Sequence, residues 1–178
     1  MDWTGSEIKG DFEMVIETMY LRVLALTMSK NDASLAGVFF ASDGCGKVTM
    51  MSTDTHRLTV ITLDELCPEC EFLVPAEIIK SVKDKKMKLV DLSGVSALQR
   101  KMPDYMRTLD AVKYPTGEAA QINIDYLVDA SKAICELGVP RKWSKLLYIH
   151  HNGSGPATID TGLDNVKIAI MPLAGRVG

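Results

Sequence analysis

The sequence predicts an α+β fold, in which antiparallel strands form the sheet and helices cover one of its faces. Three stretches carry apolar residues at spacings of three and four, the pattern of amphipathic helices, at residues 12–28, 76–84 and 126–137. Two or three short strand-like runs follow each stretch. Because helices and strands do not alternate one for one, a parallel doubly wound sheet is disfavoured.

The first of these units predicts one helix and three strands. Asp11 is the expected N-cap of the helix at 12–28. Residues 43–46 read Asp-Gly-Cys-Gly, a hairpin-type turn, because glycine accepts the positive φ that such turns require. The strands expected on either side of that turn and after it lie at 35–42, 47–52 and 57–63.

The second and third units are predicted from similar signals. Pro75 suits the start of the helix at 76–84, since proline lacks the N–H that would be unpaired there. Ser93-Gly94 is a turn between two strand-like runs, and residues 103–116 are expected to be irregular. Asp125 caps and Gly138 ends the third helix. The remaining strands are expected at 86–92, 95–101, 120–124, 146–150, 157–160 and 166–171.

Composition limits the classes of function. The 178 residues are 47% hydrophobic and 24% charged, typical of a globular chain that buries its own core. No apolar run approaches the roughly 20 residues that span a bilayer, and the polar, acidic first residues do not suit a secretory signal, so we expect a cytoplasmic protein with no membrane partner. The net charge of −3 disfavours a wholly basic surface but allows one basic face.

A polar cluster follows the strand at 47–52. Asp54, His56 and Arg57 are either a structural ion pair at a strand end or a general base oriented by a carboxylate, with Ser52 as a nearby hydroxyl. No nucleophile elbow, phosphate-binding glycine loop or paired-histidine metal motif accompanies the cluster. The sequence therefore favours a protein that is not an enzyme.

Cysteines leave a second alternative open. Cys67 and Cys70 have the CxxC spacing of half a zinc site or a redox pair, and Cys45 and His56 are the candidates to complete a metal site. A second CxxC is absent. We therefore expect free thiols with no metal and no cofactor, and a metal- or thiol-dependent enzyme remains the alternative.

Four segments, in this order, resemble the bacterial DNA polymerase III beta subunit, the sliding clamp family: Leu35-Ala36-Gly37, residues 53–58, Met102-Pro103-Asp104-Tyr105 and residues 170–173. The resemblance implies sheets outside and helices inside, facing duplex DNA. It implies a clamp-like domain at 1–110 and half a domain at 118–178. Thr55 stands where the family has glycine. Family clamps are longer, so the resemblance is to a shortened form, bacterial or phage-encoded, that assembles with copies of itself.

The resemblance also implies two sites. The family's pocket for apolar peptide tails maps to Leu35, Thr53, His56, Arg57, Leu58, Pro103, Arg107 and Met171. The alternative is that the apolar members are core. Lysines on the helix side would contact phosphates without reading sequence, where the alternative is a solvated helix face: Lys80, Lys83, Lys85, Lys86 and Lys132.

The expected function is that of a processivity factor, which binds duplex DNA without sequence specificity and tethers a DNA polymerase or repair protein through the pocket. The alternative is a clamp-fold interaction module, a regulator or decoy, that does not encircle DNA.

Overall fold

A computed structural model describes residues 7–9, 14–65, 67–83, 88–110, 122–139, 147–151 and 155–172. Its nine-stranded sheet is antiparallel throughout, in the order β1-β8-β6-β3-β4-β5-β11-β10-β9, and β2 pairs with β7 in a second, two-stranded sheet. The strands are β1 (Glu7–Lys9), β2 (Val15–Glu17), β3 (Gly37–Ser42), β4 (Lys47–Thr53), β5 (Arg57–Asp64), β6 (Cys70–Pro75), β7 (Leu89–Asp91), β8 (Ser96–Leu98), β9 (Tyr148–His150), β10 (Ala157–Asp160) and β11 (Val166–Ile170). The helices are α1 (Thr18–Ala25), α2 (Ala76–Lys83), α3 (Met106–Asp110) and α4 (Ile124–Glu136).

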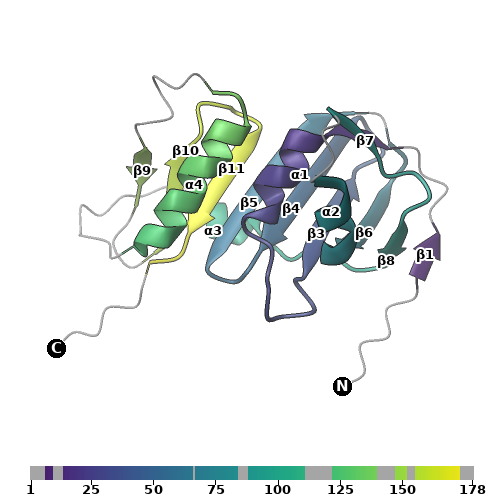
Figure 1. Cartoon of the computed structure of the whole chain (residues 1–178), viewed down its shortest axis with the longest axis horizontal. Coiled ribbons are helices and arrows are strands. Elements are labelled where there is room, and N and C mark those ends of the chain that lie inside the picture. The colour runs from purple at the N-terminus through teal and green to yellow at the C-terminus, as the bar shows by residue number, and fades with distance from the viewer. Residues whose placement is uncertain are drawn as a thin grey trace.

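The predicted layering is confirmed: α1, α2 and α4 lie side by side on one face of the sheet (Figure 1). We call this the helix face. Its core is large and draws on all three helices and on the sheet strands. The opposite, outer face carries a smaller cluster, which residues 102–109 and Leu35 cover: Phe39, Met51, Leu58, Val60, Leu73 and Ala169.

Strand β3 shows why the apolar run at 35–42 is continuous. Val38 and Phe40 belong to the helix-face core, whereas Phe39 between them belongs to the outer cluster. Phe40 stacks on Phe72 of the neighbouring β6 with ring centroids 5.3 Å apart. Strands covered on both faces are apolar at every position rather than at alternate ones.

The pairing of β5 with β11 joins the first part of the chain to its end. The register runs from Val166 opposite Ile61 to Ile170 opposite Arg57. The backbone N–H of Met171 then donates to the carbonyl oxygen of His56 at 2.6 Å. One sheet therefore runs through both predicted segments, 1–110 and 118–178, whose division into domains remains a prediction.

Several predicted elements are confirmed. The strands at 35–42, 47–52 and 57–63 match β3, β4 and β5, and the turn between the first two has Gly44 at φ 70° and Gly46 at φ 104°. The last three predicted strands match β9, β10 and β11. Gly138, at φ 72°, follows the end of α4 in the left-handed conformation expected of it.

The prediction of one helix over 12–28 is wrong. Val15–Glu17 is a strand paired with β7, and the helix spans only Thr18–Ala25. Glu17 occupies the N-cap position without a side-chain hydrogen bond, and Asp11 lies outside the described residues. Ile16 fits a helical spacing, but its pairing with Val90, far along the chain, decides its conformation.

One strand that the sequence analysis did not predict precedes the second helix. Cys70–Pro75 forms β6, which ends where α2 begins. The runs on either side of Ser93-Gly94 do not pair with each other, because β7 pairs with β2 while β8 pairs with β1 and β6.

Two further corrections concern the segment before the last helix. Residues 106–110, expected to be irregular, form α3. The prediction of a strand at 120–124 is wrong at its last residue, because Ile124 begins the helix α4. Residues 120–121 lie outside the described part of the chain. The cap is Asn123, whose side chain accepts from the backbone N–H of Asp125, rather than Asp125 itself.

Among the described residues, we find no helix with the length and apolar character that crossing a bilayer requires.

Candidate functional site

A cavity of about 110 Å³ lies at the rim of the sheet, where β4 ends, β5 begins and β11 ends. We call it the end pocket. Residues from the segment after β8 and from α3 form its far wall. The lining consists of Met51, Thr53, Thr55, His56, Arg57, Leu58, Pro103, Asp104, Tyr105, Thr108, Ala169 and Met171.

The base of the end pocket is apolar. Met51, Leu58 and Ala169 are buried in the outer cluster, and Tyr105 packs against the same cluster. Met171 is 37% exposed at the mouth. A buried apolar base with an exposed, adaptable methionine at the opening suits an apolar side chain inserted from solvent.

Hydrogen bonds between side chains and the backbone hold the turn at residues 53–57, which carries the polar lining. The Asp54 carboxylate accepts from the backbone N–H groups of His56 and Arg57 at 3.1 and 2.8 Å. The Thr53 hydroxyl donates to the Arg57 carbonyl at 2.7 Å and accepts from the Thr55 N–H at 3.1 Å. Thr55 adopts φ 73°, the left-handed region that glycine occupies without steric cost. The turn is therefore formed before any ligand arrives.

Arg57 is held by two carboxylates. Its Nε and Nη2 donate to Asp54 Oδ2 at 3.0 and 2.7 Å, and its Nη1 donates to Asp129 Oδ2 of α4 at 2.6 Å. The guanidinium carbon lies 4.7 Å from the centre of the Tyr126 ring. The structural ion pair is thus present, and it fastens α4 to the rim of the sheet.

Charge explains the pKa directions in this network. Burial lowers the pKa of Arg57, but Asp54 and Asp129 together raise it above its ordinary value. Burial raises the pKa of Asp129, and hydrogen bonds from Lys132 and Arg57 outweigh that effect and leave it below its ordinary value. Arg57 and Asp129 are therefore both charged at neutral pH.

The geometry does not favour a general-base arrangement. The His56 ring is exposed and stacks on Tyr126 with centroids 6.3 Å apart. Ser52 is fully buried, and its hydroxyl donates to the Leu24 carbonyl at 2.7 Å. Within the described part of the chain, no hydrogen bond joins the His56 ring to Asp54 or Ser52. A catalytic base needs such contacts within hydrogen-bond reach.

The structure brings together six of the eight residues predicted for the peptide site. Leu35 instead packs against the outer cluster, and Arg107 is exposed on α3 outside the lining. The six predicted residues in the lining are Thr53, His56, Arg57, Leu58, Pro103 and Met171. The six lining residues that were not predicted are Met51, Thr55, Asp104, Tyr105, Thr108 and Ala169. Two of the missed residues follow from strand geometry, because side chains two positions apart on a strand point to the same face. Met51 precedes the predicted Thr53 by two residues, and Ala169 precedes the predicted Met171 by two.

The predicted DNA-contacting lysines are only partly described. Lys80 is exposed on α2. Lys132 is exposed on α4, and its ammonium pairs with Asp129 at 2.8 Å. The side chain of Lys83 and the whole of Lys85 and Lys86 lie outside the described residues.

Acidic side chains share the helix layer. Glu77 on α2 and Asp125 on α4 are exposed, and Glu136 of α4 pairs with Arg22 of α1 at 2.6 Å. The described part of this layer therefore carries charge of both signs.

The environment of the Cys67–Cys70 pair does not favour a reactive thiolate at Cys70. The Cys67 and Cys70 sulfurs lie 3.8 Å apart. Burial, then the neighbouring Cys67, raises the pKa of Cys70 to about 11, so little thiolate is present at neutral pH. Cys45 is exposed in the hairpin turn. Over the described ranges, no three His, Cys, Asp or Glu side chains gather as a metal site would require.

Solved structures show which fold this is. A DNA polymerase III beta subunit from Pseudomonas aeruginosa is similar with a TM-score of 0.69 at 16% identity, over 97% of this chain and 69% of that one. The beta subunits of Borrelia burgdorferi and Thermotoga maritima are similar with TM-scores of 0.67 and 0.62, at 16% and 12% identity, over 96% and 98% of this chain and 66% and 68% of theirs.

No protein-family model and no curated protein matches the sequence. At such low identity the likeness concerns the path of the backbone and not the site chemistry. On that basis, this chain has the fold of the bacterial DNA sliding clamps.

Proposed function

We propose that this clamp-fold protein holds a short apolar segment of a DNA polymerase or repair protein in the end pocket. The observation that carries the proposal is the pocket itself. Residues that are distant in sequence, such as Leu58, Pro103 and Met171, line one surface cavity with a buried apolar base. Polar groups around such a base orient a ligand, while the apolar base supplies affinity.

The size of the end pocket indicates the kind of ligand. About 110 Å³ is well below the several hundred Å³ of a site that encloses a drug-sized molecule. It suits one inserted apolar side chain of an extended peptide. Because the turn at 53–57 is already hydrogen-bonded, binding requires little ordering of the protein.

We further propose that the helix layer faces duplex DNA and that copies of the chain assemble through their sheets. Lys80 and Lys132 are the described lysines for phosphate contact. Strands β1 and β9 end the sheet, and a terminal strand offers backbone groups for pairing with another chain.

A second candidate function is an interaction module that binds the partner peptide without encircling DNA. The acidic residues of the helix layer favour it, since Asp129 pairs with Lys132 and Glu136 with Arg22. Repulsion between carboxylates and phosphates opposes DNA binding at this surface.

Peptide binding is tested with Met171→Asp, which places a charge at the pocket mouth, and with Met106→Asp as the matched control. Met106 is 51% exposed on α3 and does not line the end pocket. A fluorescein-labelled peptide ending in leucine and phenylalanine is titrated with each protein. We expect Met171→Asp to weaken binding at least about tenfold, the effect of leaving a charge against an apolar ligand. Equal affinity of the two variants would contradict the proposal.

DNA binding is tested by the salt dependence of affinity for duplex DNA, together with the mass of the protein in solution. The clamp role predicts an assembly larger than one chain and an affinity that falls as salt rises, with a shallower slope for Lys80→Glu. A monomer with no measurable affinity for duplex DNA, but with intact peptide binding, would establish the second candidate.

A further inference from the structure

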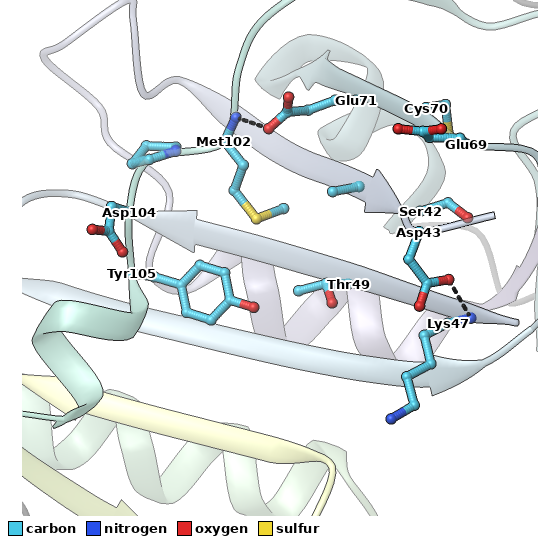
Figure 2. Close-up of a pocket in the computed structure, with 12 residues that line it drawn as sticks. Ser42, Asp43, Lys47, Thr49, Glu69, Cys70, Glu71, Met102, Asp104 and Tyr105 are labelled. Carbon is cyan, nitrogen blue, oxygen red and sulfur yellow. Dashed lines mark hydrogen bonds between the residues drawn. The ribbon is translucent and has the colours of Figure 1, made fainter. Parts of the chain in front are cut away.

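A cavity of about 720 Å³ lies on the outer face beside the end pocket. We call it the side cavity. It opens between strands β3 and β4 on one side and residues 69–71 and 102–105 on the other (Figure 2). Its lining consists of Ala41, Ser42, Asp43, Lys47, Thr49, Glu69, Cys70, Glu71, Met102, Pro103, Asp104 and Tyr105.

The side cavity and the end pocket share a wall. Pro103, Asp104 and Tyr105 line both. The Tyr105 ring projects from its segment toward Thr49 on the neighbouring strand (Figure 2). The two cavities are therefore adjacent, and the residues that flank a ligand in the end pocket are within reach of the side cavity.

The side cavity is acidic and lies over a partly apolar base. Its carboxylates are those of Asp43, Glu69, Glu71 and Asp104, against the single cation Lys47. Met102 and Tyr105 contribute the apolar surface, and both pack on the outer cluster.

Two of these carboxylates have structural roles. Asp43 accepts from the backbone N–H groups of Cys45 and Lys47 at 2.8 and 3.2 Å, and Glu71 accepts from that of Met102 at 2.6 Å. For Glu69 and Asp104, no hydrogen bond or ion pair is found within the described part of the chain. These two are available to a ligand.

We propose, resting on the proposed function, that the side cavity binds a lysine- or arginine-bearing flank of the same partner peptide whose apolar residue occupies the end pocket. Long basic side chains lay their aliphatic stems on apolar surface and keep the charged group in water. Here Met102 and Tyr105 contact the stem, and Glu69 and Asp104, on opposite sides of the cavity in Figure 2, each pair with a separate basic group. The partner segment is thus apolar at one end and basic beside it.

The test compares two fluorescein-labelled peptides with the same leucine–phenylalanine end, one flanked by Lys-Arg-Lys and the other by Gln-Gln-Gln. The flank is placed in turn before and after the apolar residues. At low salt we expect the basic peptide to bind about threefold to tenfold tighter in one of these orders, as a few exposed ion pairs allow. High salt should remove the advantage.

Glu69→Lys should abolish the advantage and leave the affinity for the glutamine peptide unchanged. Its control is Glu77→Lys, the same charge change on α2 at the helix face, which should preserve the advantage. The inference is overturned if neither basic peptide binds tighter than its glutamine counterpart, or if both variants act alike. Binding of neither peptide type would instead overturn the end pocket, and this inference with it.

Discussion

The two faces of the large sheet are covered very differently. On the helix face, α1, α2 and α4 bury a core that extends across the sheet, including Phe40, Met50 and Ile61 at 0% exposure. On the outer face, five partly exposed side chains of the described residues pack over a small cluster: Leu35, Leu98, Met102, Tyr105 and Leu109. Both proposed binding cavities lie on the thinly covered face. The large core and the two cavities proposed for the partner peptide thus lie on opposite sides of one sheet.

The largest effect is expected from replacing the two adjacent phenylalanines of β3, which face opposite sides of the sheet. We expect Phe40→Ala to lower the free energy of unfolding by about 3 to 5 kcal/mol, because its cavity lies in the closed core. Phe39→Ala should cost about 3 kcal/mol or less, since partly exposed Leu35 and Met102 can settle inward. Urea unfolding measures both changes. An equal or larger loss for Phe39→Ala would show that the outer face is as tightly packed as the core.

A smaller effect is expected at the ion pair that fastens α4 to the sheet rim. Asp129→Asn leaves the half-buried Arg57 with one carboxylate and should lower the free energy of unfolding by about 1 to 2 kcal/mol at pH 7. Asp125→Asn, on the same helix but exposed, is the control. A loss no greater than that of the control would mean that the helix is held by apolar packing alone.

The same pair predicts a pH dependence. Because the folded-state pKa of Asp129 is below 3.8, its contribution is complete above that value and is lost as the pH falls through the lower folded pKa. The stability difference between the wild type and Asp129→Asn should therefore shrink in acid. Urea unfolding at pH 7 and pH 3 compares the two proteins. A difference that grows in acid would reverse the assigned sign.

A gain in stability is expected from a substitution in the turn of the end pocket. Thr55 sits at φ 73°, where a β-branched residue is strained, so Thr55→Gly should raise the free energy of unfolding by about 0.5 kcal/mol. Thr62→Gly, inside β5, should instead lower it. Thermal unfolding of both variants gives the two signs. A loss at position 55 would show that the threonine side chain contributes contacts that exceed its backbone strain.

The mildest probe leaves stability unchanged and uses thiol reactivity. At pH 8, Cys45 and Cys135 are exposed and should react quickly with a thiol reagent, whereas Cys67 is buried and the raised pKa of Cys70 slows its reaction. A Cys45→Ser, Cys135→Ser variant should retain only the slow phase. A fast phase in that variant would support the alternative hypothesis of a thiol-dependent enzyme.

Elements that depend on local signals were predictable. Strands β3 and β4 combine an apolar run with a glycine turn, and both were found with nearly the observed bounds. The fold class followed from the grouping of strands after helices. Half of the residues that line the end pocket followed from the resemblance, which supplied Leu58, Pro103 and Met171 together.

Elements that depend on distant partners were not predictable. Residues 15–17 fit a helical spacing and became a strand only through β7. Arg57 was predicted as a pocket residue, yet two of its hydrogen bonds go to Asp54 and another to Asp129, 72 residues away. No single-sequence pattern reports that α4 packs against the rim and brings this carboxylate to the guanidinium.

The hydrogen bond from Met171 to the His56 carbonyl has a consequence for how binding preference changes over generations. The spacing between the Met171 and His56 sides of the end pocket is set by main-chain atoms, which every amino acid but proline supplies at position 171. Side chains there can be exchanged one at a time while the opening keeps its dimensions. Exchanges in the lining would thus change which ligand fits the proposed site, while the hydrogen-bonded backbone beneath it stays the same.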